Sequence, residues 1–164
     1  MYTNRHVVSG TKSVSAKFLD GSRLRLGDVE VADGRDLVRF EVGLSYPALE
    51  FDETIPDIGE RIVTFGNSAG TGVCTEIQGL INGVGPAAIE TDAEFVKGNS
   101  GSPILASNYK VVAVATFVVD GKKTVSWTNE GTRFAKTRRF GLRVAGAEWR
   151  KMSWLNFVKE TEDE

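Results

Sequence analysis

Short segments in which hydrophobic and polar residues alternate run along most of the chain. A period of two is typical of β-strands with one buried face. Turn-forming sequences such as PDIGE at residues 56–60 and NGVGP at residues 82–86 separate these segments. Their regular spacing predicts an all-β sandwich or barrel. The expected strands are residues 13–19, 23–31, 37–42, 61–66, 73–81, 111–119, 123–127 and 139–144.

One of these segments contains a break in its alternation. Leu24 and Leu26 have one parity, whereas Val29 and Val31 have the other. A strand keeps one face buried across such a shift only where an extra residue is inserted. The sequence therefore predicts a bulge or turn at Gly27–Asp28.

The last stretch of the chain has a different pattern. Its large hydrophobic residues recur at mixed helical spacings, and acidic residues follow from Glu160. We expect one amphipathic helix that closes the chain, with a frayed acidic tail from Glu160. The residues that set this pattern are Trp149, Met152, Leu155, Phe157 and Val158.

The composition is that of a soluble globular protein. The chain has 164 residues, of which 41% are hydrophobic and 26% charged, enough for one domain or two small lobes. The 20 basic and 22 acidic residues give a net charge of -2, so no nucleic-acid partner is predicted. No apolar run reaches the length of a membrane-spanning helix.

Metal and cofactor chemistry have little support in the sequence. One cysteine, Cys74, excludes an intrachain disulfide, and one histidine with one cysteine cannot form a Cys/His zinc site. A site built mainly from carboxylates stays open. We predict no metal and no cofactor.

The segment EFVKGNSGSPIL, residues 94–105, raises the question of catalysis. Ser100 lies between Asn99 and Gly101, with Gly98 just before them and an apolar run just after. Such residues form tight turns in many proteins. They also form nucleophile loops, because glycines let backbone N–H groups converge on a developing anion.

A nucleophilic serine needs a base, and a histidine base needs a carboxylate that orients it. His6 is the only histidine in the chain, and Asp36 stands directly before an expected strand. The alternatives are a buried, hydrogen-bonded core histidine and an ordinary turn aspartate. These residues alone leave both interpretations open.

Four segments, quoted in chain order, carry a resemblance to the trypsin-like serine peptidases, and most to the bacterial HtrA/Deg-type branch. TNRHVV resembles the histidine motif of that branch, and DLVRFEV resembles its aspartate strand. GERIVTFGNSAG resembles the opening of its second barrel, and IETDAEFVKGNSGSPIL resembles its serine motif. The order His, Asp, Ser is that of chymotrypsin. The resemblance covers about residues 2 to 145.

The resemblance implies two antiparallel β-barrels followed by a C-terminal α-helix. Residues 1–57 would form an N-terminal barrel with His6 and Asp36, and residues 58–146 a C-terminal barrel with Ser100. Residues 147–164 would form the helix and acidic tail. Members of the family have strands before the histidine motif, so we expect the first barrel of this chain to be partial.

The family's catalytic roles carry over to matching positions. By resemblance, Ser100 is the nucleophile, His6 the general base and acid, and Asp36 the residue that orients His6. The oxyanion hole is formed by Gly98, Asn99 and Ser100, with the N–H groups of Gly98 and Ser100 as donors. The implied activity is serine endopeptidase cleavage through an acyl-enzyme.

Two positions depart from the pattern. Ser102 stands where the family has a second glycine after the nucleophile, a small change. Asn99 stands where zymogen-activated trypsins have an aspartate, and an amide cannot form an ion pair with a freed N-terminal amine.

Substrate selection is encoded more weakly. The resemblance implies that residues 114–119 pair with the backbone of a peptide or unfolded-protein substrate. Thr116 and Phe117 would then lie near the S1 and S2 subsites, although Phe117 also suits a plain buried strand. Glu94 would lie near the base of S1.

Two other functions remain open. One is a catalytically impaired protein of the protease fold that binds peptides or proteins without cleaving them. The other is an unrelated β-barrel binding module. The first residues, MYTNRHVVSG, lack both the basic region and the apolar core of a signal peptide. The oligomeric state and the compartment stay open, periplasmic and secreted locations included.

Overall fold

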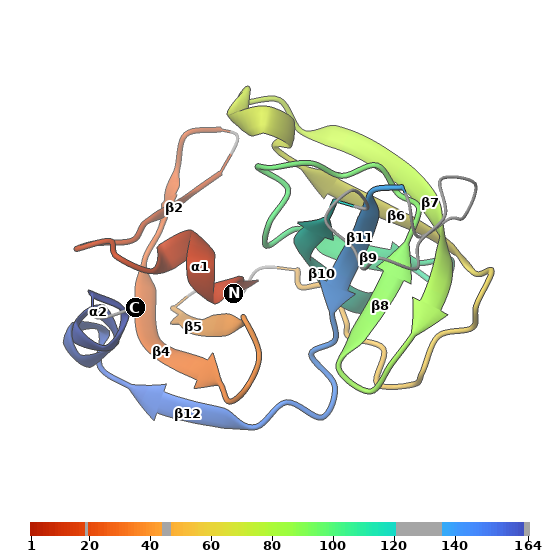
Figure 1. The fold of residues 1–164 in the computed structure, drawn as a ribbon. Coiled ribbons are helices and arrows are strands. Elements are labelled where there is room, and N and C mark those ends of the chain that lie inside the picture. Colours follow the sequence, from red (N-terminus) through yellow and green to blue (C-terminus); the bar gives the residue numbers. More distant parts are fainter. Residues whose placement is uncertain (19, 44–46, 121–135, 163–164) are drawn as a thin grey trace. The chain divides into compact units, whose positions relative to one another are not determined.

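The computed structural model describes residues 1–164 except residues 19, 44–46, 121–135 and 163–164. Strands dominate the described part (Figure 1). The chain divides into two compact units. Unit 1 comprises Met1–Ala48 and Ala147–Glu164, and unit 2 comprises Leu49–Gly146.

Unit 2 is built around a closed β-barrel of antiparallel strands. In the described residues the strands follow the order β10-β11-β8-β7-β6-β9 around the barrel. Ile62, Ile81, Ile89, Phe95 and Ile104 are among the buried side chains of its core. The elements are β6 (Arg61–Gly66), the 3₁₀ turn η1 (Ser68–Gly70), β7 (Thr75–Val84), β8 (Ala88–Thr91), β9 (Pro103–Ala106), β10 (Val111–Val119) and β11 (Arg138–Leu142).

Unit 1 contains an open sheet rather than a closed barrel. Its described strands form a four-stranded sheet of order β1-β5-β4-β12 and a separate two-stranded sheet of β2 and β3. This open sheet agrees with the partial first barrel that the sequence predicts. The elements are β1 (Tyr2–Thr3), α1 (Arg5–Val8), β2 (Ala16–Lys17), β3 (Arg23–Leu24), β4 (Leu26–Ala32), β5 (Val38–Val42), β12 (Trp149–Met152) and α2 (Trp154–Glu162).

Several strand predictions are confirmed. β6 and β10 have the predicted bounds. The pairing of β4 with β5 shifts register between Leu26 and Val29, so the predicted bulge at Gly27–Asp28 is confirmed. The strand expected at residues 123–127 lies outside the described residues. The elements β1, α1 and β8 were not predicted from the sequence.

The C-terminal stretch is half strand and half helix. Trp149–Met152 pair with Val29–Ala32 of β4, so the helix begins at Trp154 and is shorter than predicted. An unpaired edge of β4 provides backbone hydrogen bonds that the isolated segment lacks. Glu160 lies inside the helix rather than in a frayed tail.

The units differ in their bounds from the barrels suggested by the sequence. Residues 49–57 lie with unit 2, because Val111 of β10 donates to Glu50 O at 2.8 Å and accepts from Asp52 N at 2.9 Å. Buried Arg143 donates to the carbonyl oxygens of Glu53 and Thr54. Residues 147–162 of the C-terminal segment pack in unit 1, where Phe157 lies in the core. None of the described helices is long and apolar enough to span a membrane.

Candidate active site

His6 and Asp36 lie together in unit 1. The His6 Nδ1 atom is 2.5 Å from Asp36 Oδ2, and the His6 backbone N–H donates to Asp36 Oδ1 at 2.8 Å. A carboxylate at Nδ1 favours the tautomer that carries its proton there, which leaves Nε2 as an acceptor. The His6 side chain is half exposed within unit 1. This is the arrangement that a histidine general base requires.

Two short local structures hold this pair. α1 is a single turn after Asn4, and the Asn4 side-chain amide donates to Asp36 O at 3.0 Å. Asp36 ends the turn between β4 and β5, where Gly34 has a φ of +67°. Glycine adopts this left-handed conformation without a steric penalty. The asparagine and the glycine thus bring the two functional side chains together.

Ser100 lies in unit 2, on a loop between Thr91 and β9. The loop is fastened on both sides of the serine: Gly101 N donates to Ala115 O, and Ala115 N donates to Ser102 O, each at 2.9 Å. Ser100 itself is half exposed. A hydroxyl on a firmly held and accessible turn suits a nucleophile.

Asn99 anchors the loop from inside. The side chain is fully buried, its Oδ1 accepts the Val96 N–H at 2.9 Å, and its Nδ2 lies 3.2 Å from Ser68 Oγ. The Asn99 backbone N–H donates to Val96 O at 3.0 Å. That N–H is therefore engaged inside the loop. The sequence prediction counts Asn99 among the residues of the oxyanion hole, with the N–H groups of Gly98 and Ser100 as its donors.

Gly98 is held in a conformation that only glycine adopts readily. Its φ is +100°, and a Cβ built there would lie 2.4 Å from Asn67 O and 2.9 Å from Gly70 N. The loop therefore packs its backbone directly against the backbone of η1 and its flanks. In the described part of the chain, the backbone N–H groups of Gly98 and Ser100 donate no hydrogen bond to the protein. They are available to an anion.

A cavity of about 220 Å³ adjoins Ser100 within unit 2. Most of its lining is apolar, and Phe117 is half exposed and stacks on Phe140 with ring centroids 4.9 Å apart. Thr116 is buried at a register shift in β10, and its hydroxyl donates to Val114 O at 2.7 Å. The lining residues are Phe95, Val96, Lys97, Ser100, Thr116, Phe117 and Val118.

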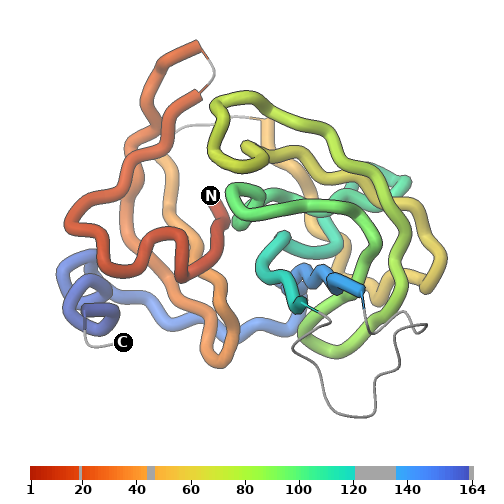
Figure 2. The backbone as a smooth tube through the Cα atoms, turned by 45° about the horizontal axis from the view of Figure 1, so that its top comes forward, coloured from red at the N-terminus to blue at the C-terminus, as the bar shows by residue number. Residues whose placement is uncertain are grey.

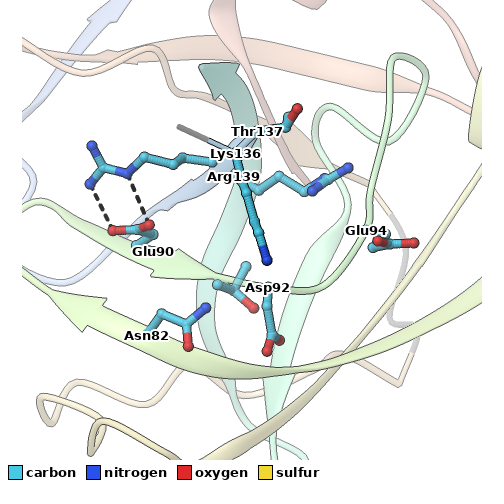
Figure 3. Close-up of a pocket in the computed structure, with 9 residues that line it drawn as sticks. Asn82, Glu90, Asp92, Glu94, Lys136, Thr137 and Arg139 are labelled. Carbon is cyan, nitrogen blue, oxygen red and sulfur yellow. Dashed lines mark hydrogen bonds and ion pairs between the residues drawn. The ribbon is translucent and has the colours of Figure 1, made fainter. Parts of the chain in front are cut away.

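Glu94 lines a different cavity. This second cavity of unit 2, about 400 Å³ in volume, is rich in charged side chains, and Glu94 lies there with Asp92 and Lys136 (Figure 3). Two other residues that line this cavity form an ion pair, in which Arg138 Nη2 donates to Glu90 Oε2 at 2.8 Å. The cavity at Ser100 does not include Glu94. The structure thus brings Thr116 and Phe117 to the serine but not Glu94.

Some supporting residues were missed from the sequence. Ser68 touches Asn99, and a Cβ on Gly66 would lie 2.3 Å from Ser102 Oγ and 2.5 Å from Asn99 Nδ2. These residues come from GNSAG, which precedes the nucleophile loop by about thirty positions. The glycine and serine content of GNSAG was the available signal, but it does not say what the segment packs against.

The family model described as a trypsin-like peptidase domain matches residues 1–114, well over half of the chain. The chain belongs to the trypsin-like peptidase family. The matched part includes the two segments of unit 1 that carry His6 and Asp36, and the loop that carries Ser100.

Relatives of this trypsin-like peptidase chain are bacterial serine proteases. A probable periplasmic DegP-like serine endoprotease of Bartonella henselae is 30% identical over 144 residues, covering 81% of this chain and 28% of the relative. A similarly named protein of Buchnera aphidicola is 23% identical, covering 89% of this chain and 36% of the relative. The Do-like serine protease HtrA of Bacillus subtilis is 27% identical, covering 68% and 29%. The chain thus spans about a third of the length of these curated relatives.

A solved structure shows the same fold. The serine endoprotease from Yersinia pestis superposes with a TM-score of 0.65 at 21% identity, covering 87% of this chain and 48% of the other. At this identity the likeness concerns the fold alone. The mainly β architecture with a C-terminal helix, predicted from the sequence, is confirmed.

Proposed function

We propose that this member of the trypsin-like peptidase family is a serine endopeptidase that works through an acyl-enzyme. The observation that carries the proposal is the contact of His6 Nδ1 with Asp36 Oδ2 at 2.5 Å. Family membership and the glycine-rich loop of Ser100 support it. The proposal requires His6 Nε2 to reach the Ser100 hydroxyl in the working enzyme.

The first half of the reaction makes the acyl-enzyme. Ser100 Oγ attacks the carbonyl carbon of the scissile bond while His6 Nε2 takes the hydroxyl proton. The carbonyl oxygen becomes an oxyanion, which accepts hydrogen bonds from the N–H groups of Gly98 and Ser100. Asp36 stabilises the imidazolium. His6 then gives the proton to the leaving amine, the C–N bond breaks, and an ester remains on Ser100.

The second half releases the acid product. His6 takes a proton from a water molecule, whose oxygen attacks the ester carbonyl, and the oxyanion forms again at the same two N–H groups. When this intermediate collapses, the bond to Ser100 Oγ breaks and His6 returns the proton to the serine. The net charge of the site stays the same throughout, because each proton that His6 takes up offsets the negative charge that forms on the oxyanion. Asp36 stabilises the imidazolium, and the two N–H groups stabilise the oxyanion.

We infer that the cavity at Ser100 receives an apolar side chain from the substrate residue before the scissile bond. Its volume of about 220 Å³ and its lining by Phe95, Val96 and Phe117 suit an aliphatic side chain. Glu94 lines another cavity, and none of the described residues that line this one carries a carboxylate to pair with a basic substrate residue. β9 pairs with β10 as far as Val114, and the Ser100 loop pairs with Ala115, so we infer that a substrate peptide adds to β10 beyond Ala115.

Covalent labelling tests the proposal. A fluorophosphonate should attach to Ser100, located by peptide mass spectrometry, and Ser100→Ala should abolish both labelling and casein cleavage. Ser102→Ala is the matched control, because it removes a hydroxyl two residues away on the same loop. Labelling that persists in Ser100→Ala, or a wild-type protein that binds peptides without reacting, would refute the endopeptidase assignment.

A further inference from the structure

The C-terminal helix α2 contacts the segment that carries His6 at several places within unit 1. Figures 1 and 2 both show α2 beside the red segment of the chain that follows α1. The contacts include an apolar one in the core, two hydrogen bonds and an ion pair. They are Phe157 in one core cluster with Val8, Thr161 Oγ1 accepting from Gly10 N at 3.4 Å, Trp154 Nε1 donating to Lys12 O at 3.0 Å, and Arg5 Nη2 with Glu160 Oε1 at 3.4 Å.

This support matters because α1 is only four residues long. A single helical turn in water does not hold itself together, since forming its first hydrogen bond costs more backbone entropy than it returns. Two of the four residues of α1 are β-branched valines, which weaken a helix further. The position of the imidazole therefore depends on what packs against α1 from elsewhere.

Glu160 is the central residue of a charged network on α2. Its carboxylate accepts from Arg150 Nη2 at 3.0 and 3.2 Å and from Arg5 Nη2 at 3.4 Å. The carboxylate raises the pKa of the Arg150 guanidinium. Arg150 Nε also lies 3.7 Å from Asp33 Oδ1.

The two ends of this network reach the two segments of the catalytic pair. Arg5 is the neighbour of His6 on α1, and Asp33 begins the turn that leads to Asp36. Within unit 1, the charged groups that line the cavity beside His6 are Arg5, Arg35 and Asp36. The network thus ties the helix of the base to the turn of its orienting carboxylate, outside the pair itself.

We propose that Glu160 is a positioning residue, which holds the imidazole of His6 in register with Asp36 through Arg5 and Arg150. The effect on turnover rests on the catalytic roles proposed above, whereas the effect on the imidazole does not. Exposed ion pairs add little to stability. Glu160 therefore affects the geometry of the pair more than the stability of the fold.

Nuclear magnetic resonance gives a direct readout, because His6 is the only histidine and yields a single imidazole Nδ1–H signal. Glu160→Gln removes the charge and keeps the shape. We expect its Nδ1–H proton to exchange with water faster than in wild type, and kcat to fall about twofold to fivefold with KM unchanged, which corresponds to about 0.4–1 kcal/mol. Glu162→Gln is the matched control on the same helix and should behave as wild type.

Arg150→Gln breaks the same network from β12 and keeps the test decisive if Glu160→Gln fails to fold. It should accelerate the same exchange. Equal Nδ1–H exchange rates in Glu160→Gln, Arg150→Gln and Glu162→Gln would overturn the positioning role. A protein that shows the expected exchange rates but does not label at Ser100 would instead refute the proposed endopeptidase function and leave the positioning role standing.

Discussion

Replacing Gly98 with alanine should disable the nucleophile loop more than it unfolds the protein. The new Cβ would lie 2.4 Å from Asn67 O, about 1 Å inside an ordinary contact of about 3.4 Å. Both atoms are fixed to backbone, so the loop must move by about that amount. A displacement of about 1 Å at a reacting group costs on the order of 100-fold in rate. We therefore expect Ser100 labelling to slow by about that factor.

A substitution at a second glycine separates the cost of the left-handed backbone conformation from the effect of the steric clash. Gly59 has a φ of +89° in unit 2, and a Cβ there meets nothing within 4 Å. Gly59→Ala should cost about 1–2 kcal/mol from the left-handed conformation alone and label at nearly the wild-type rate. Gly98→Ala has both this conformational cost and the steric clash, so we expect its free energy of unfolding to decrease by about 2–4 kcal/mol. Denaturant unfolding and fluorophosphonate kinetics measure the two effects. Wild-type labelling by Gly98→Ala would refute the close backbone packing at that position.

Two predictions concern pH. Turnover should decrease as acid protonates His6, because a protonated imidazole cannot take the serine proton. A pH–rate profile that is flat into clearly acidic solution would exclude a histidine base. Hydrogen bonds from Thr54 and Asn108 lower the pKa of the Asp52 carboxyl to about 2. A lowered pKa stabilises the fold above the unfolded value near 3.8, and this stabilisation is lost as the pH falls toward 2. Asp52→Asn should therefore flatten the decline of stability over that range in acid melts, and a decline equal to that of wild type would show that Asp52 is not its source.

The sequence predicted strands well where a local pattern was strong enough to decide them. β6 and β10 alternate or run apolar between clear turn signals, and their predicted bounds hold. The bulge in β4 was visible because one inserted residue changes the parity of every residue that follows. In these segments the local pattern and the tertiary structure favour the same conformation.

The missed elements are those that distant partners impose. Trp149 and Met152 have a spacing that suits a helix as well as a strand end, and only the edge of β4 decides for a strand. The valines of α1 disfavour a helix, yet hydrogen bonds from Asn4 and His6 to Asp36 bend the chain into one turn. Short-range pattern carries no information about such partners.

The residues of the candidate site also include some that the sequence suggested and one whose position it did not predict. The glycine-rich loop and the lone histidine made Ser100, His6 and Asp36 candidates, because the chemistry restricts which residue types can serve. Their roles were assigned only through the resemblance to the trypsin-like peptidases. The position of Glu94 could not be predicted from its distance of six residues from Ser100. The chain turns between them, and Glu94 faces a cavity lined by β8 and β11 instead.

The buried amide of Asn99 explains how the loop is held from inside without a buried charge next to Ser100. Its oxygen accepts from Val96 N–H while its nitrogen lies against Ser68 Oγ. An aspartate there could accept but not donate, and its charge would lose hydration at a fully buried position. A buried carboxylate on the residue before Ser100 would also oppose the negative charge that the proposed mechanism creates at the N–H groups of Gly98 and Ser100. Asparagine fastens the loop without that opposition, which suits the oxyanion-binding role proposed for the N–H groups of Gly98 and Ser100.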